Sequence, residues 1–387
     1  MRRPVVPGLT GGVALVALGL AGAAGCAITR TLTAPYSGRR YSTQILNVST
    51  HGDLSMVQLA NTAQTRQSGR FGAFLQDGRH IKFGTTPIST GGGITRSVSA
   101  ADADALAGVE HVSWTGIEFA NPNDAGLQAV DVEIPTEHGS NPAWVVGDPA
   151  RATWAVHVHG LGSTRAGTLR GVQVASELGF TSLVTTYQNS AEGPAVGSRR
   201  SMLGLDESDD VEHALEYAVA HGAERIVMFG WSMGANIALT MAEKSRWRRR
   251  IVAIVAESPV LDWRATLRSN LAGLGLPAWM TCLALPWLMN PVLARCSGLD
   301  HAIDLDALDW TPQDRIETPT LILQGRCDRS APWQLAEHVA AQNPRVHLEL
   351  FDADHTTTWN SDPERWRSTV ADWVTTRLGG PADPRMS

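Results

Sequence analysis

Short apolar runs alternate with amphipathic runs along the chain from about residue 112 to its C-terminus. The apolar runs have the length and continuity of strands buried in a parallel sheet, and they occupy residues 153–160, 181–187, 225–230, 251–259, 318–325 and 346–353. The amphipathic runs have helical spacing and occupy residues 209–222, 235–246, 333–342 and 362–378. This alternation predicts an α/β fold with a mostly parallel central sheet and helices on both faces.

The earlier part of the chain has a different pattern. From residue 41 to about residue 108 it is polar and interrupted by glycines, and its short apolar runs are typical of strands. We therefore predict a small β-rich N-terminal module over residues 30–110 and a larger main domain over residues 111–380.

An insertion with an uncharged, apolar core interrupts the alternation at residues 263–310. A second membrane span is one interpretation of its core, residues 271–294. Pro277, Pro286 and Pro291 argue against one continuous helix. A lid of short amphipathic helices over an apolar pocket is the favoured prediction.

A long uncharged run also lies close to the N-terminus. Arg2 and Arg3 precede a charge-free stretch from Pro4 to Thr29 that is rich in glycine and alanine. We predict that residues 1–29 form an uncleaved signal anchor spanning the cell membrane, with the main domain outside the cytoplasm. The alternatives are a lipoprotein signal that ends on Cys26 and a cleaved signal peptide of a secreted protein.

Composition and charge narrow the class of protein. The apolar fraction of 43% and the charged fraction of 18% are those of a globular protein, and the formal net charge of -6 argues against nucleic-acid binding. The four cysteines lack the spacing of a zinc site. Cys282 and Cys296 are either a disulfide within the insertion or two small buried residues.

The segment Gly230-Trp231-Ser232-Met233-Gly234 matches the pattern Gly-x-Ser-x-Gly. Composition alone would produce this match in roughly one such chain in five, so its context decides its meaning. A predicted strand ends directly before Ser232 and a predicted helix starts directly after it. This sharp strand–turn–helix junction is typical of a nucleophilic serine, whose neighbouring glycines leave room for the turn.

A serine nucleophile needs a base, and the base needs an orienting acid. His355 follows the last predicted strand and Asp328 follows the strand before it, so both belong at the carboxyl edge of the sheet with Ser232. We predict the triad Ser232, His355 and Asp328. Other acids considered for the orienting role are Asp262, Glu257 and Asp354.

Two backbone N–H groups should stabilise the oxyanion of the tetrahedral intermediate. We expect them to come from Met233, directly after the nucleophile, and from Leu161, in the loop after residues 153–160. His157 and His159 in that segment could instead be a metal pair, but no third group of ligands supports a metal site.

Three further residues are expected to border the substrate. They are Gly160, Tyr187 and Trp231, with the alternative for Tyr187 that it only shapes its loop.

From about Gly126 to Leu378 the chain resembles the α/β-hydrolase superfamily of serine hydrolases. The resemblance is carried by the segments HVHGLG, LVTTYQNS, GWSMGANIAL, SPVLDW, LQGRCDRSAP and DADHTTTWN. It is similar in particular to membrane-associated bacterial members of the serine-aminopeptidase and lysophospholipase-like branch. The resemblance implies the α/β-hydrolase fold and assigns the triad roles to Ser232, Asp328 and His355. Gln188 stands where relatives often have an arginine, which weakens any anion contact carried over from them.

Together these features predict a serine hydrolase that cleaves an ester with a hydrophobic acyl group through an acyl-enzyme. The expected partner is a small-molecule ester or lipid, and no metal or organic cofactor is implied. The alternatives are a serine aminopeptidase or an acyltransferase with the same triad, and a catalytically silent hydrolase fold used for binding.

Overall fold

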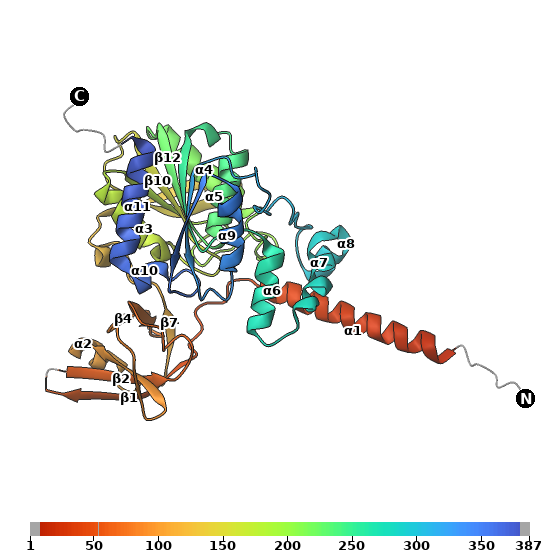
Figure 1. The fold of residues 1–387 in the computed structure, drawn as a ribbon, viewed down its shortest axis with the longest axis horizontal. Coiled ribbons are helices and arrows are strands. Elements are labelled where there is room, and N and C mark those ends of the chain that lie inside the picture. The colour runs from red at the N-terminus through yellow and green to blue at the C-terminus, as the bar shows by residue number, and fades with distance from the viewer. Residues whose placement is uncertain (1–7, 53, 380–387) are drawn as a thin grey trace, which may run out of the picture.

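The computed structural model describes residues 8–52 and 54–379, and Figure 1 shows their arrangement. A large α/β domain carries a small β-sheet module at one end, and the first helix projects away from both (Figure 1).

The large domain is built on an eight-stranded sheet with the order β15-β14-β13-β12-β10-β11-β9-β8. Its strands are β8 (Ala129–Thr136), β9 (Gly139–Val146), β10 (Thr153–Val158), β11 (Thr181–Thr185), β12 (Arg225–Trp231), β13 (Ile251–Glu257), β14 (Thr320–Gly325) and β15 (Val346–Phe351). Neighbours from β11 to β15 run parallel, whereas β9 pairs antiparallel with both β11 and β8. The predicted mostly parallel α/β sheet is confirmed.

Helices cover both faces of this sheet because its central strands are apolar on both sides. On one face lie α3 (Leu169–Glu177) and α11 (Pro363–Leu378), and on the other lie α4 (Glu207–Ala220), α5 (Met233–Lys244) and α9 (Trp333–Gln342) (Figure 1). Successive residues of β12 alternate between the two cores: Val227 packs with the α3 and α11 side, and Ile226 packs with the opposite side. The α3 helix had no counterpart in the sequence-based prediction.

A second sheet forms the N-terminal module, a name used below for residues 43–115. Its seven strands have the order β4-β3-β7-β1-β2-β6-β5. They are β1 (Thr43–His51), β2 (Leu54–Ala60), β3 (Phe71–Phe74), β4 (His80–Phe83), β5 (Ile88–Thr90), β6 (Gly93–Val98) and β7 (His111–Thr115). Helix α2 (Ala100–Leu106) completes a separate small core in which Leu106 is fully buried.

Helix α1 (Gly8–Leu32) corrects the prediction of a membrane anchor. Within residues 8–52 and 54–379, no helix has the length and apolar character needed to cross a membrane. The apolar run is diluted by glycine and alanine, and its C-terminal turns pack against protein. The signal-anchor prediction is therefore wrong, and the predicted location at the cell membrane, outside the cytoplasm, loses its basis. Residues 1–7, with Arg2 and Arg3, lie outside the described residues.

The insertion at 263–310 folds into short helices separated at prolines. They are α6 (Trp263–Gly273), α7 (Thr281–Met289) and α8 (Pro291–Ser297). Pro291 occupies the first turn of α8, where its missing N–H has no helical partner to lose. Helix α7 packs against the C-terminal half of α1, where the Cβ position of Gly25 would lie 2.0 Å from Leu283 O.

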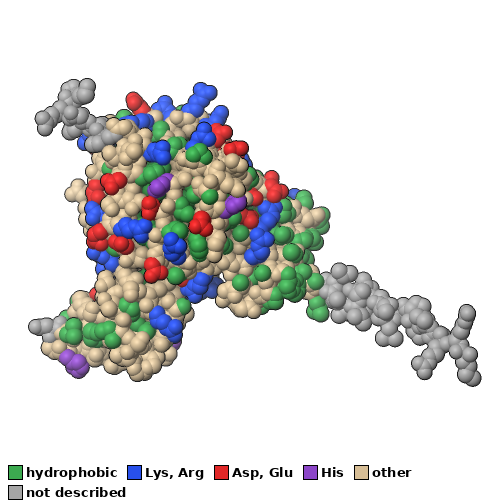
Figure 2. All heavy atoms as spheres, viewed as in Figure 1, with side chains coloured by type: hydrophobic (Ala, Val, Ile, Leu, Met, Phe, Trp, Pro, Cys, Tyr) green, Lys and Arg blue, Asp and Glu red, His purple; other side chains and the backbone are tan. Residues whose placement is uncertain are grey.

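Apolar side chains gather on the surface of the insertion, on the side toward α1 (Figure 2). The large exposed ones there are Leu274, Leu276, Trp279 and Val292. Cys282 and Cys296 are also exposed and are free thiols, so they are neither bridged nor buried.

Three-residue and four-residue helical turns complete the chain. They are η1 (Asn123–Ala125), η2 (Arg165–Thr168), η3 (Arg248–Arg250), η4 (Ala278–Met280) and α10 (Thr358–Ser361).

Candidate active site

Ser232 lies in the tight turn between β12 and α5. Its φ of 53° and ψ of -114° are strained for a residue with a side chain, as expected of a nucleophile elbow. Gly230 and Gly234 make the turn possible. A Cβ on Gly230 would lie 2.4 Å from Ala235 Cα, and one on Gly234 would lie 2.2 Å from Val158 O.

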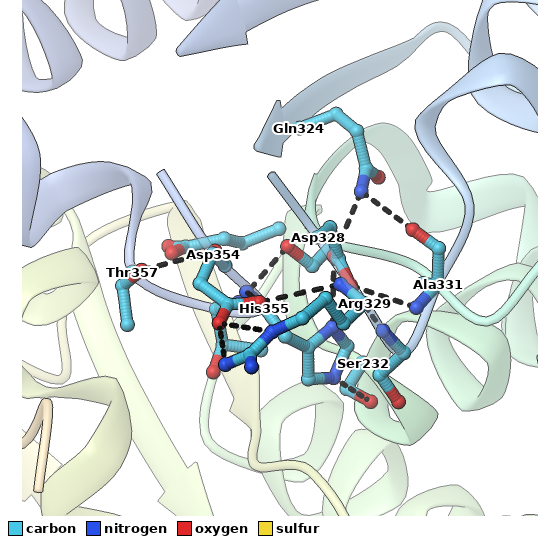
Figure 3. A network of polar contacts seen from close by, with 12 residues as sticks. Ser232, Gln324, Asp328, Arg329, Ala331, Asp354, His355 and Thr357 are labelled. Carbon is cyan, nitrogen blue, oxygen red and sulfur yellow. Dashed lines mark hydrogen bonds and ion pairs between the residues drawn. The ribbon is translucent and has the colours of Figure 1, made fainter. Parts of the chain in front are cut away.

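His355 reaches this serine from the loop after β15. Its Nε2 lies 2.9 Å from Ser232 Oγ, and its Nδ1 lies 2.9 Å from Asp328 Oδ2 (Figure 3). Because a carboxylate only accepts hydrogen bonds, Nδ1 carries the proton and Nε2 is free to accept the Ser232 proton. The structure thus brings together all three residues of the predicted triad.

Asp328 is buried and receives four hydrogen bonds. Its Oδ1 accepts from the N–H groups of Ser330 and Ala331 at 2.8 Å, and its Oδ2 accepts from Gln324 Nε2 at 2.8 Å besides His355. Gln324 was missed in the sequence because its role depends on a contact across one turn, without a motif.

The other acids considered are occupied elsewhere. Asp262 caps α6 through the N–H groups of Arg264 and Ala265, and Glu257 accepts from Trp231 Nε1 at 2.9 Å. Asp354 pairs with Arg329. Burial alone would raise the pKa of Asp354, but hydrogen bonds from Arg329 and from the N–H of His355 outweigh burial and lower it.

The segment that carries His355 is bonded on several sides. We call residues 352–361, which include α10, the His355 segment. Thr356 has a φ of 54°, and its N–H donates to Ser258 Oγ at 3.0 Å. On the α3 side, Arg170 donates to Thr356 O at 2.9 Å and to Asn360 Oδ1 at 2.6 Å.

The two predicted oxyanion donors lie on adjoining segments. Met233 is the first residue of α5, so its N–H is among those without an intrahelical acceptor. Leu161 follows Gly160, whose Cβ position lies 3.2 Å from Ser232 Cβ, so this loop touches the nucleophile turn. Tyr187 holds the loop of Gly160 and Leu161 in place, because its buried hydroxyl donates to Gly160 O at 3.0 Å.

The histidines before that loop have separate partners. His157 Nε2 lies 3.1 Å from Ser182 Oγ, whereas His159 Nδ1 lies 3.0 Å from the Tyr187 hydroxyl. Burial lowers the pKa of His157 to about 3. In the part of the chain that the structure describes, no group of three or more His, Cys, Asp or Glu is placed to hold a metal ion.

A cavity of about 980 Å³ opens over Ser232 and His355. Gly160, Leu161, Tyr187 and Trp231 all border it, although the Trp231 indole is buried toward α3. Residues that follow α1, residues of the N-terminal module and residues of the insertion also line the cavity. They are Tyr36, Arg39, Gln64, Gln67, Trp114, Asn270, Gly273 and Leu274. The lining mixes polar with apolar groups, so the predicted apolar pocket is only partly matched. Gln188 is buried and is not among the lining residues.

Comparison with known proteins places the chain in a family. The sequence profile described as "Alpha/beta hydrolase family" matches residues 155–369. The chain belongs to this family of hydrolases, as the resemblance predicted, and the match singles out no branch within it. No curated protein sequence matches the chain.

Solved structures agree with the fold. The esterase Pf2001 from Pyrococcus furiosus, in two crystal forms, is 21% identical and gives TM-scores of 0.50 and 0.51; the match covers 66% of this chain and 95% or 94% of that one. Est1E from Butyrivibrio proteoclasticus is 15% identical with a TM-score of 0.46, over 64% of this chain and 99% of that one. At 21% identity, the likeness to Pf2001 shows the fold alone.

Proposed function

We propose that this hydrolase cleaves a small-molecule ester, with Ser232 as nucleophile, His355 as general base and Asp328 as the orienting acid. The observation that carries the proposal is the continuous chain of hydrogen bonds from Ser232 Oγ through both nitrogens of His355 to the buried Asp328. Nucleophile, base and orienting acid within hydrogen-bond reach are the arrangement that acyl transfer requires.

In the first step, Ser232 Oγ attacks the ester carbonyl carbon while its proton moves to His355 Nε2. The oxyanion accepts hydrogen bonds from the N–H groups of Met233 and Leu161. The intermediate collapses, the bond to the alcohol oxygen breaks, and the alcohol leaves with the proton from His355. Water then gives a proton to His355 and attacks the acyl-enzyme. The bond to Ser232 Oγ breaks as His355 returns this proton to it, which releases the carboxylic acid and restores Ser232.

The lining of the cavity favours an ester over an aminopeptidase substrate. An aminopeptidase needs a carboxylate to receive the free amino group of its substrate. Among the described lining residues, Asp354 is paired with Arg329, and the buried Glu207 accepts from Ser201 Oγ and from two backbone N–H groups. Burial also raises the pKa of Glu207, against the effect of these hydrogen bonds, which disfavours its charged form.

The predicted preference for a hydrophobic acyl group rested on the apolar character of the insertion. Within it, α7 packs against α1, and the insertion contributes Asn270, Gly273 and Leu274 to the cavity. The proposal therefore names the ester bond, and the length of the acyl chain is a quantity to be measured.

An active-site fluorophosphonate probe tests the nucleophile. We expect rapid labelling of the wild-type protein and none of Ser232→Ala, with hydrolysis of p-nitrophenyl esters lost in the same variant. Equal labelling of both proteins would refute the assignment, and absence of labelling in the folded wild-type protein would favour the silent binding fold.

Substrate series then define the reaction. Hydrolysis of p-nitrophenyl esters from acetate to palmitate measures the acyl preference, and a parallel series of aminoacyl anilides measures peptidase activity. Faster turnover of the anilides would replace our ester proposal by aminopeptidase activity.

A further inference from the structure

The N-terminal module touches the catalytic machinery at the His355 segment. Arg70 N donates to Asn360 O at 2.9 Å, and Asn360 Nδ2 donates back to Arg70 O at 2.5 Å and to Gly116 O at 2.8 Å. Asn360 is fully buried. Backbone of the module thus pairs with a residue five positions after His355.

The same asparagine is held from the opposite side. Arg170 of α3 donates from Nη1 to Asn360 Oδ1 and from Nη2 to Thr356 O. The side-chain oxygen of Asn360 therefore faces the large domain, and its side-chain nitrogen faces the module. Asn360 therefore bonds to α3 and to the module at the same time, and the His355 segment is held between these two parts.

A second contact lies next to His355 itself. Gln67 Nε2 donates to Asp354 Oδ2 at 3.2 Å, and the other oxygen of Asp354 accepts the backbone N–H of His355 at 2.8 Å. Asp354 thereby connects the module to the backbone of His355.

Gln67 is in turn fixed from within the module. The fully buried Arg96 donates to the backbone oxygens of Gln67, of Thr65 at 3.1 Å and of Gly84 at 2.9 Å. A buried guanidinium is costly to retain unless hydrogen bonds compensate it. Here the compensation comes from the backbone that presents Gln67 to the His355 segment.

Gly69 shows how closely the two parts approach. It adopts a φ of +117°, and a Cβ at this position would lie 2.2 Å from Asn360 O. No side chain fits at position 69 without moving the module or the His355 segment.

We propose that the N-terminal module positions His355 for catalysis, with Gln67 and the backbone at Gly69 and Arg70 as its positioning residues. This inference rests on the proposed function, because it assigns His355 the role of general base. The His355 segment follows the edge strand β15 and contains a residue with positive φ, so its conformation depends on hydrogen bonds from neighbouring segments, and the module supplies several of them.

Gly69→Ala tests the proposal, with Gly78→Ala as its matched control. Both glycines lie in the module with positive φ, at +117° and +87°, so both substitutions strain the backbone. Only the Cβ at Gly69 would press on Asn360, since nothing lies within 4 Å of the Cβ position at Gly78. We expect kcat and the fluorophosphonate labelling rate of Gly69→Ala to fall about 10- to 100-fold, the size expected for displaced catalytic groups. The KM of Gly69→Ala should change little. The kcat, KM and labelling rate of Gly78→Ala should all stay close to those of the wild-type protein.

A milder pair of variants covers the case in which Gly69→Ala does not fold. Gln67→Ala removes the donor to Asp354, whereas Gln58→Ala removes an exposed amide that bonds Thr90 within the module. We expect kcat and labelling to fall in Gln67→Ala alone, both in folded protein by circular dichroism.

The proposal is overturned if folded Gly69→Ala and Gln67→Ala keep kcat and labelling within about twofold of their controls. A change confined to KM would also overturn it, since the module would then only border the substrate. These results differ from failure of the proposed function, which shows as activity retained in Ser232→Ala.

Discussion

At Asp328, four donors surround one buried carboxylate. Ser330 and Ala331 occupy Oδ1, while Gln324 and His355 occupy Oδ2. Neither oxygen can be replaced by an NH2 group without pointing a donor at a donor. The site therefore requires two acceptor oxygens, as a carboxylate provides, rather than any side chain of this shape.

Asp328→Asn should consequently lose activity on the order of 10⁴-fold in kcat, because the amide favours the wrong tautomer of His355. The measurement is steady-state hydrolysis of a p-nitrophenyl ester. Asp262→Asn is the matched control, since asparagine caps a helix as well as aspartate and Asp262 serves α6 as its N-cap. Near wild-type turnover in Asp328→Asn would show that another acid orients His355.

His157 makes a separate prediction about stability. It is fully buried, and burial lowers its pKa to about 3, while an unfolded histidine titrates near 6.5. Below about pH 6.5 the unfolded chain takes up a proton that the folded protein refuses, so stability falls as the pH drops.

We expect His157 to remove about 2 kcal/mol of unfolding free energy between pH 7 and pH 5. Urea unfolding of wild type and His157→Gln at the two pH values measures this contribution. The variant should show a shallower loss on acidification, whatever its stability at pH 7. An identical loss in both proteins would contradict the assignment of a neutral buried imidazole.

At the scale of elements, α1 and the insertion form one packed unit. Gly22 and Gly25 of α1 lie against Trp287 of α7, and Thr29 Oγ1 donates to Ala284 O at 3.3 Å. Arg200, which belongs to neither α1 nor the insertion, donates from Nη1 to Arg30 O of α1 at 2.8 Å. Because residues 31–40 continue along the cavity, the packing of α1 affects the shape of the site.

Gly25→Ala should separate α1 from α7, since its Cβ would lie 2.0 Å from Leu283 O. We expect a lower thermal midpoint and altered KM values. Gly19→Ala is the control in the same helix, because nothing lies within 4 Å of its Cβ position. Alanine there should be neutral or stabilise the helix by up to about 1 kcal/mol. Equal midpoints for the two variants would show that this contact does not form.

For the whole molecule, the sequence predicted what depends on local order. The strand before Ser232, the helix after it and the loops of Asp328 and His355 are each encoded within about ten residues, and parallel strands then bring their carboxyl ends to one edge. Gln324, Arg170 and Asn360 have no such local pattern. Their partners are chosen by tertiary packing, so sequence reasoning missed them.

The apolar run at the N-terminus shows a different limit. An apolar run in a sequence can pack against protein as well as against lipid, and the contact of Gly25 with α7 becomes visible only in three dimensions. The short helix α3 was missed for a related reason, because its buried residues include Arg170 and Gly171 besides valines.

The contact between the module and the His355 segment also has a consequence for folding during synthesis. Gln67 and Asp354 are 287 positions apart, and Asn360 and Arg70 are 290 apart. At about 5–20 residues per second, a ribosome needs on the order of 15–60 s to make the second partner after the first. During that interval the edge of the module that contacts the His355 segment has no partner, and a chain stalled before residue 355 carries Ser232 without the proposed general base. Hydrolytic activity would thus arise only after residue 355 has been made and the module has docked on the His355 segment.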